Sequence, residues 1–285
     1  MKSLNLPALD GYRDLIASCA SSYAQERTRS RKERILDSID ALIESGNRYN
    51  QLATQGSLGE IVESSICGVA EKDDLIDLYE AKLVKGKAQE RGRRVYDDIK
   101  DSAPLGICPL CSQLPVAMLD HYLPKSKYPA YSIFPANLVP SCHRCNLIKL
   151  SKANGLTLHP YYDDIQDKEW LECSMQIEDD TIVVNYCVRE DVSPWTARER
   201  MVNHLKDVGV AELYQVSASN HLIEIRESLV RLGSKGGPVS VREHLLEGLS
   251  TRKHASLNSW GTALYSEMCS CQWFINGGYS KIETV

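Results

Sequence analysis

The sequence lacks any apolar stretch that approaches the length of a membrane span, for which a helix needs about 20 consecutive apolar residues. Residues 1–15 also lack the uninterrupted apolar region of a secretory signal peptide. Internal repeats and low-complexity tracts are absent, so nothing indicates a solenoid or a disordered chain. These absences argue against a membrane partner, and we expect the protein in the cytoplasm.

The composition is that of an ordinary globular protein. The 285 residues are 43% apolar and 25% charged, which suffices for the core of one large or two modest domains. Apolar residues repeat at helical spacing in the N-terminal hundred residues, whereas residues 171–177 and 181–188 predict a two-stranded hairpin that turns at Asp179 and Asp180. The segment 233–238 (GSKGGP) predicts a linker before a final helical region.

Four of the ten cysteines form two tight CxxC pairs, CPLC and CHRC, separated by thirty residues. Each CxxC turn can direct two thiolates at one point, and two such turns complete the four-sulfur shell of a structural Zn²⁺ ion. In a cytosolic chain this spacing favours zinc over disulfides; chance pairing or a redox CxxC is the alternative. The predicted zinc ligands are Cys108, Cys111, Cys142 and Cys145.

Positive charge is concentrated around these cysteines, although the whole chain has a net charge of -5. Residues 82–152 contain twelve Lys and Arg against five acidic residues, a local charge of +7 that leaves -12 for the rest. Such a field is what binding to nucleic-acid phosphates requires, although residues 82–100 alone could be a solvated charged helix. A second basic cluster, at residues 27–34, predicts either a contact with nucleic acid or a solvated helix face.

The segment between and after the cysteine pairs combines residues suited to phosphodiester hydrolysis. His121 can accept a proton from an attacking water near neutral pH, although a structural histidine is the alternative. Asp120 and Asn146 offer hard oxygen ligands for one Mg²⁺ or Mn²⁺ ion, which would be the catalytic metal and distinct from the zinc. Lys149, Lys125 and Arg144 are the candidates for contacts with substrate phosphates.

Residues 105–152 resemble the HNH endonuclease family, in those members where two CxxC pairs bracket D-H-x-x-P-x-S, then N-L, then C-x-x-C-N-x-x-K. The resemblance implies a ββα-metal fold, with Asp120 and His121 on a hairpin and Asn146 on the helix that follows. It also implies that Asn137 fixes the connecting loop and so the orientation of His121. The matching residues are Asp120, His121, Pro124, Ser126, Asn137, Leu138, Cys142, Cys145, Asn146 and Lys149.

These observations predict an α+β, mostly helical protein. Residues 104–158 are expected to form a small zinc-bound ββα-metal HNH module, inserted between helical N- and C-terminal regions. Residues 1–103 are expected to be helical and to dock a partner, and residues 159–285 to be a hairpin followed by helices. His159 and Tyr161, just beyond the module, are expected to pack against it or to line its groove.

The wider layout, which includes a Y-E-x-K helix before the first cysteine pair, resembles nuclease subunits that accompany ATPases in bacterial anti-phage systems such as Septu and some retrons. The resemblance implies a metal-dependent endonuclease that acts on DNA or on an RNA such as tRNA. Because the chain has no Walker A sequence, any ATP dependence would come from a partner ATPase subunit. Two other classes stay open: a non-enzymatic zinc module that binds nucleic acid or protein, and a stand-alone restriction-type endonuclease, although no helix-turn-helix is recognisable.

Overall fold

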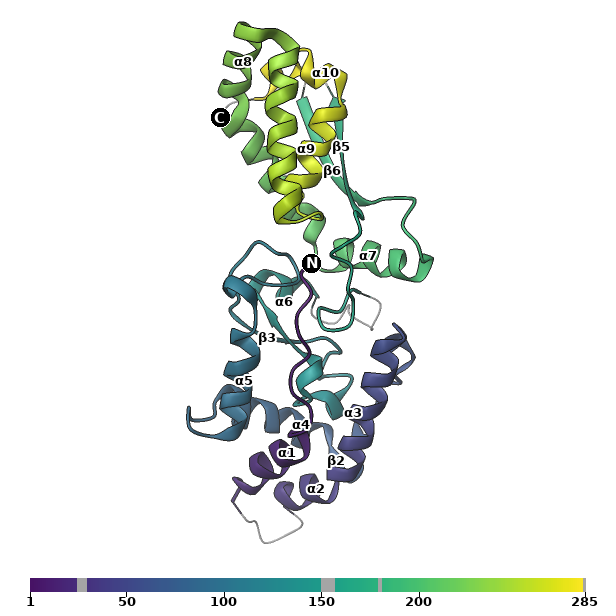
Figure 1. Cartoon of the computed structure of the whole chain (residues 1–285). Coiled ribbons are helices and arrows are strands. Elements are labelled where there is room, and N and C mark those ends of the chain that lie inside the picture. Colours follow the sequence, from purple (N-terminus) through teal and green to yellow (C-terminus); the bar gives the residue numbers. More distant parts are fainter. Residues whose placement is uncertain (25–29, 150–156, 179–180, 284–285) are drawn as a thin grey trace. The chain divides into compact units, whose positions relative to one another are not determined.

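Helices make up most of the computed structural model, which describes residues 1–24, 30–149, 157–178 and 181–283 (Figure 1). The described strands form three two-stranded antiparallel sheets. The predicted fold class, α+β and mostly helical, is therefore confirmed. Within these ranges no helix combines the length and the apolar character needed to cross a membrane.

The chain divides into two compact units, Met1–Asp164 and Ile165–Val285. The first unit contains both the expected N-terminal helical region and the cysteine-bracketed segment, so these two regions fold together. Its elements are α1 (Tyr12–Ser21), α2 (Arg31–Asp37), α3 (Ile39–Thr54), η1 (Leu58–Glu60), β1 (Ile66–Cys67), β2 (Ala70–Glu71), α4 (Lys72–Asp77), the π-helix η2 (Leu78–Val84), α5 (Arg91–Asp101), η3 (Pro104–Gly106), β3 (Met118–His121), η4 (Pro129–Tyr131), η5 (Pro135–Asn137), β4 (Leu138–Ser141) and α6 (His143–Lys149).

Aromatic side chains fasten the N-terminal helices to the loop between β3 and β4. Phe134, on that loop, packs against Tyr12 of α1 and Tyr49 of α3, with ring centroids 5.0 and 5.3 Å apart. All three side chains are buried. Gly46 of α3 permits this approach, because a Cβ atom there would lie 2.9 Å from the Phe134 ring. Helices α1 and α3 therefore form part of the framework that supports the β3–β4 loop.

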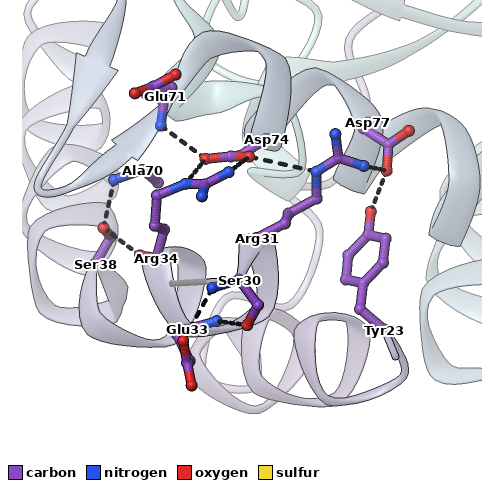
Figure 2. A network of polar contacts seen from close by, with 10 residues as sticks. All are labelled: Tyr23, Ser30, Arg31, Glu33, Arg34, Ser38, Ala70, Glu71, Asp74 and Asp77. Atoms are coloured by element: carbon purple, nitrogen blue, oxygen red, sulfur yellow. Dashed lines mark hydrogen bonds and ion pairs between the residues drawn. The ribbon is translucent and has the colours of Figure 1, made fainter. Parts of the chain in front are cut away.

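A network of ion pairs holds α2 against α4 (Figure 2). The carboxylate of Asp74, whose side chain is 2% exposed, accepts hydrogen bonds of 2.6 and 2.7 Å from the Arg34 guanidinium. Arg31 bridges Asp74 and Asp77. Two arginines of the basic cluster at residues 27–34 therefore pair with acids of their own unit and keep 35% and 28% of their side chains exposed. Contact of the cluster with nucleic acid stays a prediction. The members of the cluster that lie outside the described residues are Arg27 and Arg29.

The second unit is built on a β-hairpin. Strand β5 (Leu171–Glu178) pairs in antiparallel register with β6 (Thr181–Val188), which confirms the predicted hairpin. Asp179 and Asp180, predicted at its turn, lie outside the described residues. The helices of this unit are α7 (Trp195–Asp207), α8 (Val210–Ala255), α9 (Trp260–Ser270), α10 (Gln272–Ile275) and η6 (Gly278–Lys281).

Helix α8 reverses its direction at Gly237, where φ is 65° and ψ is -162°. His221 Nε2 lies 3.1 Å from the Tyr265 hydroxyl, and the Arg252 guanidinium lies 3.7 Å from the centre of the same ring. Because a straight helix would separate residues 221 and 252 by roughly 46 Å, the two halves must run side by side. The segment 233–238 is therefore wrong as a linker: it is a tight turn inside a helical pair, and glycine supplies its left-handed φ.

Candidate active site and metal centre

The two CxxC turns bring four buried cysteine sulfurs together, as their spacing predicted. All four Sγ atoms lie within 4.8 Å of one another, and those of Cys111 and Cys142 are 4.0 Å apart. Four sulfurs around one tetrahedral zinc ion, at Zn–S distances of about 2.3 Å, lie about 3.8 Å from each other. The cluster therefore fits a structural zinc ion, and its members are Cys108, Cys111, Cys142 and Cys145.

Backbone hydrogen bonds shape both cysteine turns. In the first turn the Ser112 N–H donates to the Cys108 carbonyl at 2.8 Å, and Ser112 takes a left-handed φ of 56° that closes the loop. In the second turn the Cys145 N–H donates to Cys142 Sγ at 3.4 Å. An amide N–H directed at sulfur favours the thiolate, which is the form that binds metal.

Strands β3 and β4 lie between the cysteine pairs and, with α6, which contains Cys145, form a ββα arrangement. Strand β3 pairs antiparallel with β4, which sets Asp120 opposite Val139 and His121 opposite Leu138. The loop between the strands ends at Asn137, and α6 starts directly after Cys142. The hairpin, the loop and the helix thus occur where the resemblance implied them.

Residues of these elements line a cavity of about 700 Å³. Asp120, His121, Lys125 and Asn146 all line it, so residues from the end of β3, the following loop and α6 meet in one place. The described residues that line the cavity do not include the four cysteines. The candidate catalytic residues and the candidate zinc ligands are therefore neighbouring but separate sites.

The imidazole of His121 is buried and held from two sides. Nε2 lies 2.9 Å from the Ser132 carbonyl oxygen; because a carbonyl only accepts, Nε2 carries the proton and Nδ1 holds the lone pair. The Tyr79 ring packs edge-on against the imidazole, with centroids 4.4 Å apart. Burial, aided by the charges of Lys125 and Lys149, lowers the pKa of His121 to about 3, although the Ser132 carbonyl opposes the shift. The imidazole is therefore neutral at neutral pH.

Lys149 is buried against Asp120 instead of facing a substrate. Its ammonium lies 2.7 Å from Asp120 Oδ2 and 2.7 Å from the His121 carbonyl oxygen, and its side chain is 3% exposed. Lys149 follows Asn146 by three residues on α6, so both side chains project from the same inner face of the helix. This position does not support the predicted phosphate contact by Lys149; the lysine instead fixes the Asp120 carboxylate and the end of β3.

Asn137 is fully buried, and its hydrogen bonds stabilise the loop that contains Ser132, whose carbonyl accepts from His121. Its Oδ1 accepts a 2.7 Å hydrogen bond from the Leu123 N–H, and its Nδ2 donates to the carbonyls of Leu123 and Tyr131 at 3.1 Å each. These bonds connect Leu123, two residues after His121, with the carbonyl of Tyr131, the residue before Ser132. Asn137 thus holds the loop in the way that the resemblance implied, and its effect on catalysis stays a prediction.

The π-helix η2 contributes residues to the cavity that the sequence analysis gave no role. Tyr79 and Glu80 line the cavity from η2, and Tyr96 does so from α5. Glu80 forms an ion pair with Lys125, whose ammonium also lies 4.6 Å from the centre of the Tyr79 ring. The Y-E-x-K motif, which begins with Tyr79 and Glu80, was the available signal in the sequence. The structure adds that these residues lie on a π-helical turn, a conformation frequent at functional sites. Helical spacing alone could not show that this turn faces a loop 45 residues further along the chain.

The remaining predicted residues take different positions. Arg144 is half-buried on α6 and does not line the cavity among the described residues, which leaves its predicted phosphate contact without geometric support. His159 is 1% exposed and packs against the Tyr122 ring, with centroids 4.0 Å apart. Packing, one of the two alternatives for His159, is therefore what the structure contains. Lys152, counted in the basic stretch, lies outside the described residues.

Fold and site together define a mostly helical α+β protein with a ββα element beside a four-cysteine cluster. No protein-family model matches the chain, and no solved structure matches it. The chain is similar to the curated protein "Protein ea31" of Escherichia phage lambda, with 27% identity over 251 residues that cover 81% of this chain and 82% of the phage protein. The similarity therefore extends far beyond the cysteine-bracketed segment. The name of the phage protein states no activity.

Proposed function

We propose that this protein is a metal-dependent HNH-type endonuclease that hydrolyses phosphodiester bonds of nucleic acid. The observation that carries the proposal is that a neutral, buried His121 shares one cavity with the oxygen ligands of Asp120 and Asn146. The adjacent cysteine cluster would hold structural zinc and keep β3, β4 and α6 in register. A binding-only zinc module would not require these three side chains to line one cavity.

The side chains can be assigned steps in hydrolysis. His121 accepts the proton of the attacking water at Nδ1, because the Ser132 carbonyl holds the other proton on Nε2. Asp120 and Asn146 would hold Mg²⁺ or Mn²⁺, and the bound ion would supply positive charge to stabilise the phosphate oxygens. Lys149 keeps the Asp120 carboxylate oriented, and its charge is already committed there.

The finer parts of the proposal concern the substrate and the partner. We propose DNA, with tRNA as the second candidate, and an effector role in a bacterial anti-phage system that works with an ATPase subunit. Support comes from the motifs around the cysteines and from the absence of a Walker A sequence. Because Tyr12 of α1 and Tyr49 of α3 pack against the β3–β4 loop, an ATPase partner that docks on these helices would use their outer faces.

The test is a cleavage assay with the pure, zinc-loaded protein on plasmid DNA and on total tRNA, in Mg²⁺, in Mn²⁺ and in EDTA. His121→Ala is the inactivating variant. His143→Ala is the matched control, because His143 lies in the same module but is exposed on α6. Circular dichroism and zinc content verify that each variant is folded.

We expect cleavage that requires the divalent metal, is lost in His121→Ala and is retained in His143→Ala. Cleavage of only one of the two nucleic acids would identify the substrate class. Activity in EDTA, or equal activity of His121→Ala and the wild type, would contradict the proposed site. If folded wild-type protein cleaves neither substrate, a binding-only module or a missing activating subunit becomes the better explanation, and a pull-down from the host would separate these two.

A further inference from the structure

His159 is a buried histidine that the proposed chemistry does not use. Its side chain lies among Tyr122, Tyr161 and Tyr162, with ring centroids 4.0, 5.5 and 4.8 Å away. The Tyr161 backbone N–H donates to Nδ1 at 3.2 Å, and a backbone N–H can only donate. Nδ1 is therefore the acceptor, and the proton of the neutral ring is on Nε2.

The protonated Nε2 of His159 points at Tyr49 on α3. The two atoms Nε2 and Oη are 3.0 Å apart, and Tyr49 is 0% exposed. Because the Tyr49 oxygen accepts from His159, its own hydrogen is available to Asn137 Oδ1, which lies 3.2 Å away. Donors and acceptors thus run in one direction, from the Tyr161 amide through His159 and Tyr49 to Asn137.

This direction settles how the Asn137 amide is oriented. Oδ1 faces the two donors, the Tyr49 hydroxyl and the Leu123 N–H, and Nδ2 faces the carbonyls of Leu123 and Tyr131. The carbonyl after that of Tyr131 belongs to Ser132 and is the one that accepts from His121 Nε2. A change at Tyr49 therefore reaches His121 through the Asn137 side chain and the two consecutive peptide units on either side of the Ser132 Cα.

We propose that Tyr49 and His159 are positioning residues of the candidate nuclease site. They hold the Asn137 amide in the orientation that fixes the Tyr131–Ser132 carbonyls, and these carbonyls fix His121. The expected effect on kcat rests on the proposed function, whereas the expected effect on the orientation of Asn137 and His121 does not. It extends the site beyond the cysteine-bracketed segment, to a helix some ninety residues earlier in the sequence and to a residue after the module.

Tyr49→Phe is the test, because it removes one hydroxyl and keeps the ring that packs on Phe134 and Tyr131. The chain offers a matched control in Tyr12→Phe. Tyr12 is also buried and also packs on Phe134, yet its hydroxyl has no hydrogen-bond partner within the described part of the chain. Tyr49→Phe loses both hydrogen bonds of the hydroxyl, but only the one donated to Asn137 leads to the site. We therefore expect Tyr49→Phe to lower kcat by about tenfold with KM unchanged, and Tyr12→Phe to change neither.

Two further measurements do not depend on nuclease activity. Amide hydrogen exchange at Leu123, whose N–H donates to Asn137 at 2.7 Å, should become about tenfold faster in Tyr49→Phe and stay unchanged in Tyr12→Phe. The ¹⁵N shifts of His159 should place the proton on Nε2, and those of His121 should move in Tyr49→Phe. His159→Gln, which keeps an N–H donor, should recover more of kcat than His159→Leu.

The outcomes separate the two proposals. If the wild type cleaves no nucleic acid, with or without a host partner from the pull-down, but Tyr49→Phe still loosens Leu123 and shifts His121, the positioning chain stands and the proposed nuclease function fails. If the wild type is active and Tyr49→Phe matches Tyr12→Phe in kcat and in Leu123 exchange, Tyr49 is core packing and the inference is overturned. A His159 proton found on Nδ1 would overturn it as well.

Discussion

The buried carboxylate of Asp74 offers a quantitative test of what holds the first unit together. Asp74→Ala removes the two hydrogen bonds from Arg34, the 3.3 Å bond from Arg31 and the 3.1 Å bond from the Glu71 N–H at the start of α4. Breaking a buried pair by removing one partner costs about 3–5 kcal/mol, but the Arg34 side chain is 28% exposed and can rehydrate. We therefore expect the low end, about 3 kcal/mol, or a fall in Tm of roughly 6–12 °C.

Asp77→Ala is the control for this substitution. Asp77 pairs with Arg31 at 2.6 Å and accepts from Tyr23, but its side chain is 37% exposed and that of Arg31 35% exposed. Solvent screens such a pair, so we expect a loss of only about 1 kcal/mol. Both substitutions remove a carboxylate from α4. Asp74 is buried and accepts four hydrogen bonds, whereas Asp77 is partly exposed and accepts two, so the difference between the losses reflects burial together with the number of hydrogen bonds.

The assay is urea and thermal unfolding followed by circular dichroism. All four tryptophans lie in the second unit, at positions 170, 195, 260 and 273, so tryptophan fluorescence follows that unit separately and should change less. Burial alone would raise the pKa of Asp74, but Arg34 and the Glu71 N–H outweigh it and lower the pKa. The stabilisation by Asp74 should thus be present at neutral pH and be lost as the pH falls below about 3.8. Equal losses for Asp74→Ala and Asp77→Ala would refute the reasoning.

Three further predictions concern the site and its framework. Cys108→Ser should release zinc to a chromophoric chelator and unfold the module, whereas Cys187→Ser, which changes an exposed cysteine of the second unit, should not. Because the pKa of His121 is lowered to about 3, the cleavage rate should show no acid limb near pH 6.5, which a pH–rate profile of the wild type checks. Between pH 6.5 and 3 only the unfolded chain binds a proton at this histidine, so the free energy of unfolding should fall as the pH drops through that range. Thermal melts of the wild type and His121→Gln check this second expectation. Gly46→Ala gains about 1 kcal/mol of helix propensity but sets a Cβ 2.9 Å from the buried Phe134 ring, so thermal melts should show a net loss of about 1 kcal/mol.

Short-range spacing explains why the metal cluster could be predicted from the sequence. A CxxC turn is a local structure, so Cys108 with Cys111, and Cys142 with Cys145, converge whatever the rest of the fold does. The β5–β6 hairpin was predictable for the same reason, because two adjacent strands pair through a short turn. Asp120 and His121 adjoin in sequence, and their place at the end of one strand follows directly.

Features that depend on tertiary packing could not be predicted in this way. A lysine side chain is suited to binding phosphate, but only the fold shows that the Lys149 ammonium is bound by Asp120 and the His121 carbonyl. Glu80 reaches Lys125 from a π-helix, which apolar periodicity does not distinguish from an α-helix. The glycine-rich segment at 233–238 has the composition of a linker, yet a turn inside a helical pair has the same composition because it needs the same backbone freedom.

The local charge of +7 at residues 82–152 overstates how much positive charge faces a substrate. Arg93 pairs with Asp97 at 2.7 Å, Lys127 with Glu63 at 2.9 Å and Lys149 with Asp120 at 2.7 Å, and Lys125 pairs with Glu80. Two of these acids, Glu63 and Glu80, lie outside the counted stretch, so the fold itself neutralises cations that the sequence count leaves unpaired. Electrostatic attraction grows with the number of phosphates that a protein neutralises. Under the proposed function, a nucleic acid would therefore have to compete with Glu80 for Lys125.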